Sequence, residues 1–177
     1  MVAGNVFALK KCTKGLLFAR VIIVLLIILN FGFIWHNSSK ESKASDKTSK
    51  KIAVTVAETV VDNYKNLSKP VQTKYVNKYN SIIRSTAHFA EFVPLGFLLL
   101  LLALSLFSFD GKKILGCLMY CTLFSLVFSF LIALTDEIHQ LFVKGRTFQT
   151  IDLTVDTAGA LLGCAVSALG VMIFKKK

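Results

Sequence analysis

The sequence predicts an all-α membrane protein, a polytopic bundle of four transmembrane helices with an outer amphipathic helical segment between the first and the second. Four long apolar stretches indicate this fold class, because a helix needs roughly 20 apolar residues to cross a bilayer. The composition agrees, since 54% of the 177 residues are hydrophobic and only 18% are charged. A soluble domain of this size must cover itself with polar side chains, so an ordinary soluble protein is excluded.

The predicted spans are residues 16–35, 92–109, 114–135 and 153–174. The second and third contain no charged residue, whereas the first carries Arg20 and the fourth carries Asp156. The apolar core of the first span is longer than the roughly 7 to 15 residues of a signal peptide, so we expect a retained anchor.

Basic residues mark the side of the membrane on which the termini are expected to lie. Three short segments together carry nine lysines and arginines but only one carboxylate, Asp110. They are segment 1–15 with the start of the first span, the turn between the second and third spans, and the residues after the fourth span. The positive-inside rule then places both termini in the cytoplasm of a bacterial cell, with the chain in the cytoplasmic membrane. These clusters account for much of the net charge of +11, so we expect a lipid bilayer and no nucleic acid as partner.

Two outer segments are predicted on the other side. Within 36–91, residues 37–51 are rich in serine and lysine and are expected to be a mobile tether. An amphipathic helix follows and ends at Pro70, and a second amphipathic run leads without a breaker into the second span. Residues 136–152 form the other outer segment, a polar loop.

Small residues recur at intervals of four on the last two spans. They are Ser125 and Ser129 on the third and Gly159 and Gly163 on the fourth. Small side chains let helix backbones approach closely in lipid, so we expect the third and fourth spans to pack on each other here.

The first polar cluster lies just before the second span. Arg84, His88 and Glu91 are four and three residues apart, which places them on one face of a helix. Pro94 follows, and because it has no N–H it leaves the carbonyl of Ala90 without its helical donor. This arrangement indicates either a functional site or a charged helix surface at the water interface.

The second cluster joins the ends of the third and fourth spans. Asp156 is its most informative member, because a carboxylate inside an apolar span costs about 2.5 to 3.5 kcal/mol unless it faces protein or water. Its expected partners are Arg146, Arg84 and His88, since both clusters fall on the outer side. The sequence therefore predicts one outward-facing site. The members of the second cluster are Asp136, Glu137, His139, Gln140, Arg146, Asp152 and Asp156.

Two kinds of chemistry are compatible with these residues. Paired carboxylates could act as acid and base, and a divalent metal could be held by oxygen and imidazole ligands. The candidate ligands are His88, Glu91, Asp136, Glu137, His139, Asp152 and Asp156. The helical zinc pattern His-Glu-x-x-His is absent from the sequence, no serine or cysteine stands beside a base as a nucleophile, and no cofactor is predicted.

Three motifs in order resemble the VanZ-like family of bacterial membrane proteins. They are Arg84-Ser85-Thr86-Ala87-His88-Phe89-Ala90-Glu91, then Asp136-Glu137-Ile138-His139-Gln140 through Gly145-Arg146, then Asp152 and Asp156-Thr157-Ala158-Gly159. The resemblance covers residues 20–174, with its motif core in 84–174. It implies a cell-envelope protein, and the namesake's association with teicoplanin resistance implies a role in antibiotic resistance.

Three functions remain open at this point. The first is a non-enzymatic envelope factor that binds a lipid-linked wall precursor or an amphiphilic antimicrobial, and so gives tolerance of lipoglycopeptides or cationic peptides. The second is a membrane enzyme acting on a lipid or wall intermediate, and the third is a structural or partner-binding subunit. Outward-facing charge favours the first, because basic outer residues attract anionic lipid head groups.

Overall fold

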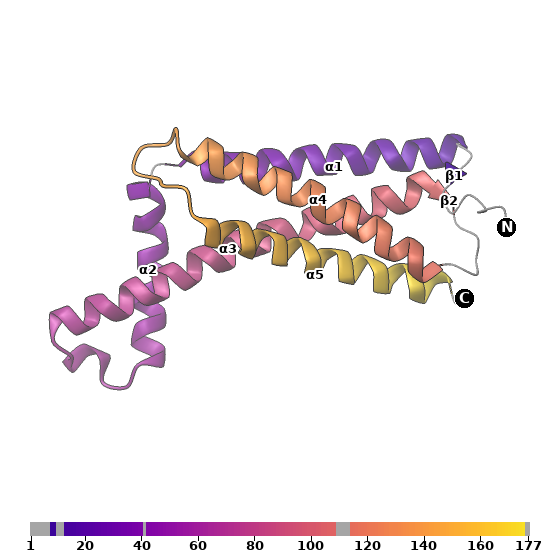
Figure 1. The fold of residues 1–177 in the computed structure, drawn as a ribbon. Helices are drawn as coiled ribbons and strands as arrows, with labels where there is room; N and C mark the ends of the chain where they lie inside the picture. Colours follow the sequence, from indigo (N-terminus) through magenta and orange to yellow (C-terminus); the bar gives the residue numbers. More distant parts are fainter. Residues whose placement is uncertain (1–7, 10–12, 41, 109–113, 176–177) are drawn as a thin grey trace.

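The computed structural model describes residues 8–9, 13–40, 42–108 and 114–175 (Figure 1). The predicted all-helical fold is confirmed. Two two-residue strands, β1 (Ala8–Leu9) and β2 (Phe107–Ser108), pair antiparallel. The remaining elements are α1 (Lys14–Ser38), α2 (Ser42–Val60), the 3-10 turn η1 (Tyr64–Asn66), α3 (Lys69–Leu106), α4 (Ile114–Gln140) and α5 (Thr150–Lys175).

Four of these helices, α1, α3, α4 and α5, are long and apolar enough to cross a membrane, as the sequence predicted. They form an elongated bundle in which β1 and the last turn of α5 lie at one end and the α4–α5 loop lies at the other (Figure 1). Large apolar side chains point outward along α1, including Phe18 and Leu29, each 68% exposed. Such a surface suits contact with lipid, because it offers water no hydrogen bonds.

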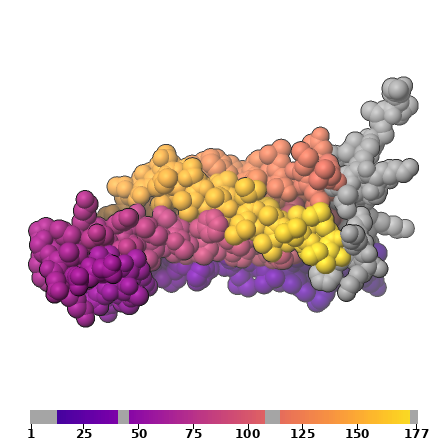
Figure 2. Space-filling view, turned by 90° about the horizontal axis from the view of Figure 1, so that it is seen from below, coloured from indigo at the N-terminus to yellow at the C-terminus, as the bar shows by residue number. Residues whose placement is uncertain are grey.

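The helix α3 extends well beyond the bundle. Its 38 residues correspond to about 57 Å at 1.5 Å per residue, whereas a bilayer core is about 30 Å thick. Pro94 lies inside α3 without ending it. The first part of α3 and α2 therefore form a projecting lobe, seen at one end of the molecule in Figure 2.

The predicted mobile tether at 37–51 is wrong, because α1 continues to Ser38 and α2 begins at Ser42. Polar partners distant in sequence hold this segment. The carboxylate of Asp46 accepts hydrogen bonds from Asn80 Nδ2 at 3.4 Å and from Arg84 Nη1 at 3.3 Å. Periodicity alone could not reveal these partners, since they lie on another helix.

The predicted polar loop at 136–152 is also shorter than expected. The helix α4 runs through Gln140 and α5 begins at Thr150, so only 141–149 lies outside helices. Gly145 has φ 79°, a left-handed conformation that glycine adopts without steric cost. The polar residues before and after the loop consequently have fixed helical positions.

We expect Asp46→Ala to loosen α2 from α3. The variant loses the two hydrogen bonds to α3 and the ion pair with Lys50 at 3.4 Å. Because Asp46 is partly exposed, the loss in unfolding free energy should be only about 1 kcal/mol. Limited proteolysis near Asn63, between α2 and η1, should accelerate, whereas Glu58→Ala should leave the cleavage rate unchanged.

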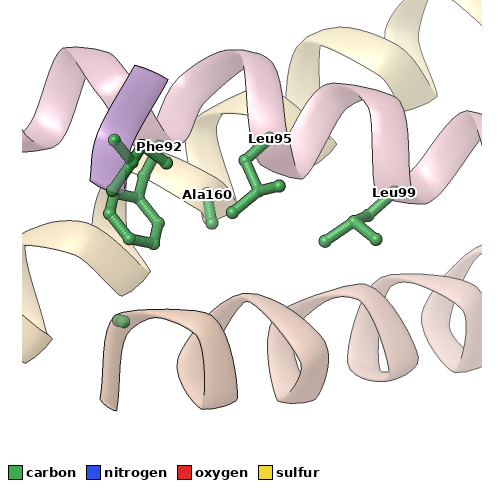
Figure 3. Close-up of a cluster of buried hydrophobic side chains, with 6 residues drawn as sticks. Phe92, Leu95, Leu99 and Ala160 are labelled. Atoms are coloured by element: carbon green, nitrogen blue, oxygen red, sulfur yellow. The ribbon is translucent and has the colours of Figure 1, made fainter. Parts of the chain in front are cut away.

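The core lies where α3 meets its neighbours. Figure 3 shows Phe92, Leu95 and Leu99 along one side of α3 with Ala160 of α5 beside them. Ile34 of α1 and Ala133 of α4 complete this cluster.

Gly159 and Gly163 of α5 pack against α3, and not against α4 as the sequence predicted. A Cβ at Gly159 would overlap the carbonyl oxygen of Phe89, and one at Gly163 would overlap that of Val93. Gly96 of α3 meets the backbone of Ala160 in the same way. Small residues thus join these two helices. Ser125 and Ser129 are fully buried on α4.

Candidate functional site

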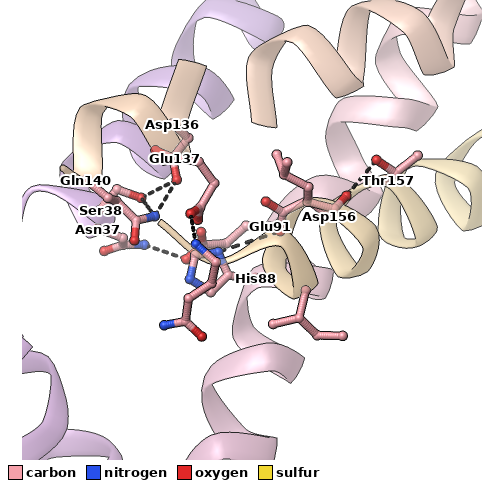
Figure 4. Close-up of polar contacts among 12 residues, drawn as sticks. Asn37, Ser38, His88, Glu91, Asp136, Glu137, Gln140, Asp156 and Thr157 are labelled. Atoms are coloured by element: carbon pink, nitrogen blue, oxygen red, sulfur yellow. Dashed lines mark hydrogen bonds and ion pairs between the residues drawn. The ribbon is translucent and has the colours of Figure 1, made fainter. Parts of the chain in front are cut away.

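Polar side chains from four helices meet at the end of the bundle opposite β1. Figure 4 shows these residues gathered from the end of α1, the middle of α3, the end of α4 and the start of α5. Both polar clusters of the sequence contribute. The central residues are Asn37, Ser38, His88, Glu91, Asp136, Glu137, Gln140 and Asp156.

A chain of hydrogen bonds runs from α1 through α4 to the following loop. Asp136 Oδ2 accepts from Ser38 Oγ at 2.7 Å and from Gln140 Nε2 at 2.9 Å. Gln140 Oε1 accepts in turn from Arg146 Nη1 at 3.1 Å. Arg146 Nε also donates to the carbonyl of Lys40 at 3.4 Å. The loop arginine is therefore fixed relative to both helices.

Asp156 faces His88 across the α3–α5 contact. The two groups are 3.6 Å apart, measured from His88 Nδ1 to Asp156 Oδ1. Asp156 is fully buried, and neither of its oxygens has a hydrogen-bond partner among the described residues. Of its three expected partners His88 is found, whereas Arg84 pairs with Asp46 and Arg146 bonds Gln140. A buried carboxylate held this way destabilises the fold, which indicates a functional rather than a structural role.

Glu91 is held by two asparagines of α1. Asn37 Nδ2 donates to Glu91 Oε1 at 2.8 Å, and Asn30 Nδ2 donates to the Glu91 backbone carbonyl at 3.3 Å. The sequence pointed to the neighbouring carbonyl of Ala90 and missed both asparagines as site residues. Asn30 interrupts the apolar run that follows Arg20, and that interruption was the signal available.

Glu137 connects α4 to the start of α5. Its carboxylate is fully buried, and Oε2 accepts from the backbone N–H of Gln149 at 2.7 Å, one residue before α5 begins. A negative charge here is also favourable toward the positive end of the α5 dipole. Glu137 thus positions the helix that carries Asp156.

We expect Glu137→Ala to release the start of α5. The N–H of Gln149 loses its acceptor, which should cost about 1 kcal/mol and speed amide exchange there. Hydrogen exchange of residues 149–152 in the purified protein measures this effect. Glu137→Gln keeps a side-chain carbonyl acceptor and serves as the control, so equal exchange in both variants would contradict the role.

His139 and Asp152 flank this polar centre without bonding to its central residues. The imidazole of His139 stacks on Trp35, with ring centroids 3.9 Å apart, and its Nε2 is 3.0 Å from Ser39 Oγ. Asp152 lines a smaller pocket of about 250 Å³ with Arg84 and Asp46. His139 therefore joins α1 to α4.

A larger pocket opens between the end of α1, α2, α3 and the α4–α5 loop. We call it the main pocket, and its volume is about 450 Å³. Its lining combines apolar, neutral polar and charged side chains. They are Asn37, Ser38, Lys40, Thr48, Ser49, Ile52, Ile83, Arg84, Ala87, His88, Glu91 and Arg146. His88 and Glu91 connect this pocket to the buried polar centre.

Two arginines, Arg84 and Arg146, bring positive charge into the main pocket. Burial lowers the pKa of the Arg146 guanidinium, and the nearby positive charge of Arg84 lowers it further. The carboxylates of Asp136, Asp152 and Glu137 act in the opposite direction. Arginine stays protonated despite such shifts, so the pocket keeps two guanidinium charges close together.

The predicted metal ligands do not assemble into a binding group. In the described ranges, no three His, Cys, Asp or Glu side chains lie close enough to hold one ion.

A model of the VanZ/LLP1 family matches residues 16–173, nearly the whole chain. The chain belongs to this family. The resemblance seen in the three motifs is thereby confirmed, and the match includes every residue of the polar centre and the main pocket. Comparison with curated proteins and with solved structures gives no match. The chain is thus a membrane protein of the VanZ/LLP1 family with four candidate spans.

Proposed function

We propose that this VanZ-like protein binds an amphiphilic or lipid-linked ligand in the main pocket at the outer face of the bacterial cytoplasmic membrane. It would thereby contribute to tolerance of teicoplanin-type lipoglycopeptides or cationic peptides. The observation that carries the proposal is the main pocket of about 450 Å³, located where the apolar part of the bundle ends.

The lining of the main pocket suits a molecule with a polar head and an apolar tail. Ile52, Ile83 and Ala87 offer apolar contacts, whereas Asn37 and His88 offer polar ones. The volume lies within the roughly 300 to 1,000 Å³ of typical small-molecule sites. A ligand could thus leave its apolar part beside the membrane.

The charge distribution supports an outward orientation of the pocket. The short segments at the other end of the bundle, which begins with Lys14 of α1 and includes Lys175 of α5, carry nine lysines and arginines against one carboxylate, whereas the pocket end carries twelve against nine. By the positive-inside rule that end faces the cytoplasm. The main pocket would then meet wall precursors and antibiotics at the outer leaflet.

Surface binding of teicoplanin tests the proposal. Cells that produce the chain should bind a different amount of labelled drug from cells without it, and should grow at higher drug concentrations. His88→Ala should lose the effect, because His88 lines the pocket. Lys78→Gln, an exposed change on the same helix, should keep it. Unchanged surface binding and unchanged susceptibility on production of the chain would contradict the proposal.

A second candidate, a membrane enzyme acting on a lipid or wall intermediate, is favoured by one observation. His88 pairs with Asp156 at 3.6 Å and lines the main pocket beside Glu91, so an imidazole and a carboxyl group could exchange protons with a ligand there. Lipid and muropeptide profiles of a deletion strain test it. A product lost on deletion and not restored by His88→Ala would favour the enzyme.

A further inference from the structure

We propose that the main pocket recognises a phosphate-bearing head group, bound between the guanidinium groups of Arg84 and Arg146. The inference rests on the proposed function, because it names the ligand class of the same pocket. Arg84 comes from α3 and Arg146 from the α4–α5 loop, so the two cations reach the pocket from different elements.

Both arginines keep donors for a ligand. Arg84 uses Nη1 to contact Asp46 at 3.3 Å. Arg146 uses Nε and Nη1 to contact Lys40 and Gln140. Among the described residues, neither Nη2 group has a partner. Arginine forks match phosphate oxygens in geometry and charge, and bonds between charged partners are about twice as strong as neutral ones.

The pocket lining also carries more positive than negative charge, with Lys40, Arg84 and Arg146 against the carboxylate of Glu91. The charge of Arg84 disfavours protonation of Arg146, which shows that the two repel each other. Lys40 lines the same pocket, with its Nζ donating to Asn37 Oδ1 at 2.8 Å. An anion between these groups would convert the repulsion into attraction.

Glu91 narrows the ligand class further. Its carboxyl group lines the main pocket, with Oε1 bonded to Asn37. An anionic head group avoids repulsion there only if it presents a hydroxyl or amine donor to Glu91. A phosphate ester that carries such a donor, attached to an acyl or polyprenyl tail along Ile52 and Ile83, satisfies each part of the lining.

Native mass spectrometry of the full chain, released from neutral detergent, tests this inference. The probes are dioleoylphosphatidylglycerol, which has phosphate and hydroxyl groups, dioleoylglycerol, which lacks the phosphate, and oleate, which offers a carboxylate. We expect preferential binding of the phosphatidylglycerol, weakened about tenfold by Arg84→Gln. Arg146→Lys keeps the positive charge but loses the paired donors of the guanidinium, so it should weaken binding less than Arg84→Gln does. A parallel titration with inorganic phosphate distinguishes the source, because displacement by phosphate alone would indicate a free-phosphate site.

A matched variant separates loss of the pocket arginine from a general loss of charge on α3. Lys78→Gln removes one exposed charge from the same helix, away from the pocket lining. It should bind the phosphatidylglycerol as the unmodified chain does. Equal binding of dioleoylglycerol or oleate that Arg84→Gln leaves unchanged would overturn the phosphate inference and leave the proposed function standing. Binding of no probe above the level of a His88→Ala variant would overturn both.

Discussion

Gly163→Val should prevent stable folding of the bundle. A Cβ at Gly163 would overlap the carbonyl oxygen of Val93 and come within 2.7 Å of the backbone nitrogen of Phe97. Both atoms belong to a helix backbone that cannot move without separating α3 from α5. We expect a loss of at least about 3 kcal/mol in unfolding free energy, measured by thermal unfolding of the purified protein in detergent.

Gly170→Val is the matched control on the same helix. A Cβ at Gly170 meets no atom within 4 Å, so the substitution should change stability by less than about 1 kcal/mol. If the two variants unfold at the same temperature, close packing of α5 on α3 does not hold the bundle together.

The second large effect concerns two fully buried aspartates with different surroundings. Asp136 accepts hydrogen bonds from Ser38 and Gln140, whereas Asp156 has only the ion-pair contact with His88. Asp136→Ala leaves buried donors without an acceptor and should destabilise the protein by about 1 to 3 kcal/mol. Asp156→Ala removes a poorly compensated carboxylate and leaves a histidine, which can be neutral, so stability should stay unchanged or increase.

Ligand binding should be affected in the opposite order, with the larger loss in the Asp156→Ala variant. Without Asp156 the imidazole of His88 loses its partner, so we expect Asp156→Ala to abolish ligand binding in a protein that still folds. Thermal unfolding and the lipid-binding assay, applied to the same preparations, measure both quantities. A sharp loss of stability in Asp156→Ala would indicate that the ion pair is structural.

The membrane architecture could be predicted because it depends on local composition. Each span is a run of apolar residues long enough for the bilayer, and the family motifs lie within the matched range 16–173. The helix partners could not be predicted, since an interval of four residues between Gly159 and Gly163 shows a close approach without showing which helix approaches. For that reason the expected partner of these two glycines was wrong: they meet α3, although α4 and α5 also contact each other.

The contacts of the polar site could likewise be predicted only in part. Helical spacing predicted that His88 and Glu91 share a face, and the expected approach of His88 to Asp156 is present. The asparagines that hold Glu91 and the aspartate that pairs with Arg84 lie on α1 and α2, distant in sequence. Serine and lysine around Asp46 indicated a tether, because the composition of a segment carries no information about a partner on another helix.

The central claim is that the main pocket lies at the outer face of the membrane, and labelling of single cysteines in intact cells tests it most directly. In a background without the four native cysteines, Thr147→Cys in the α4–α5 loop and Asn66→Cys in η1 report on the pocket end, and Thr13→Cys at the start of α1 reports on the other end. A membrane-impermeant maleimide should label the first two in intact cells and Thr13→Cys only after permeabilisation. Labelling of Thr13→Cys alone in intact cells would place the main pocket in the cytoplasm and contradict a role toward extracellular antibiotics.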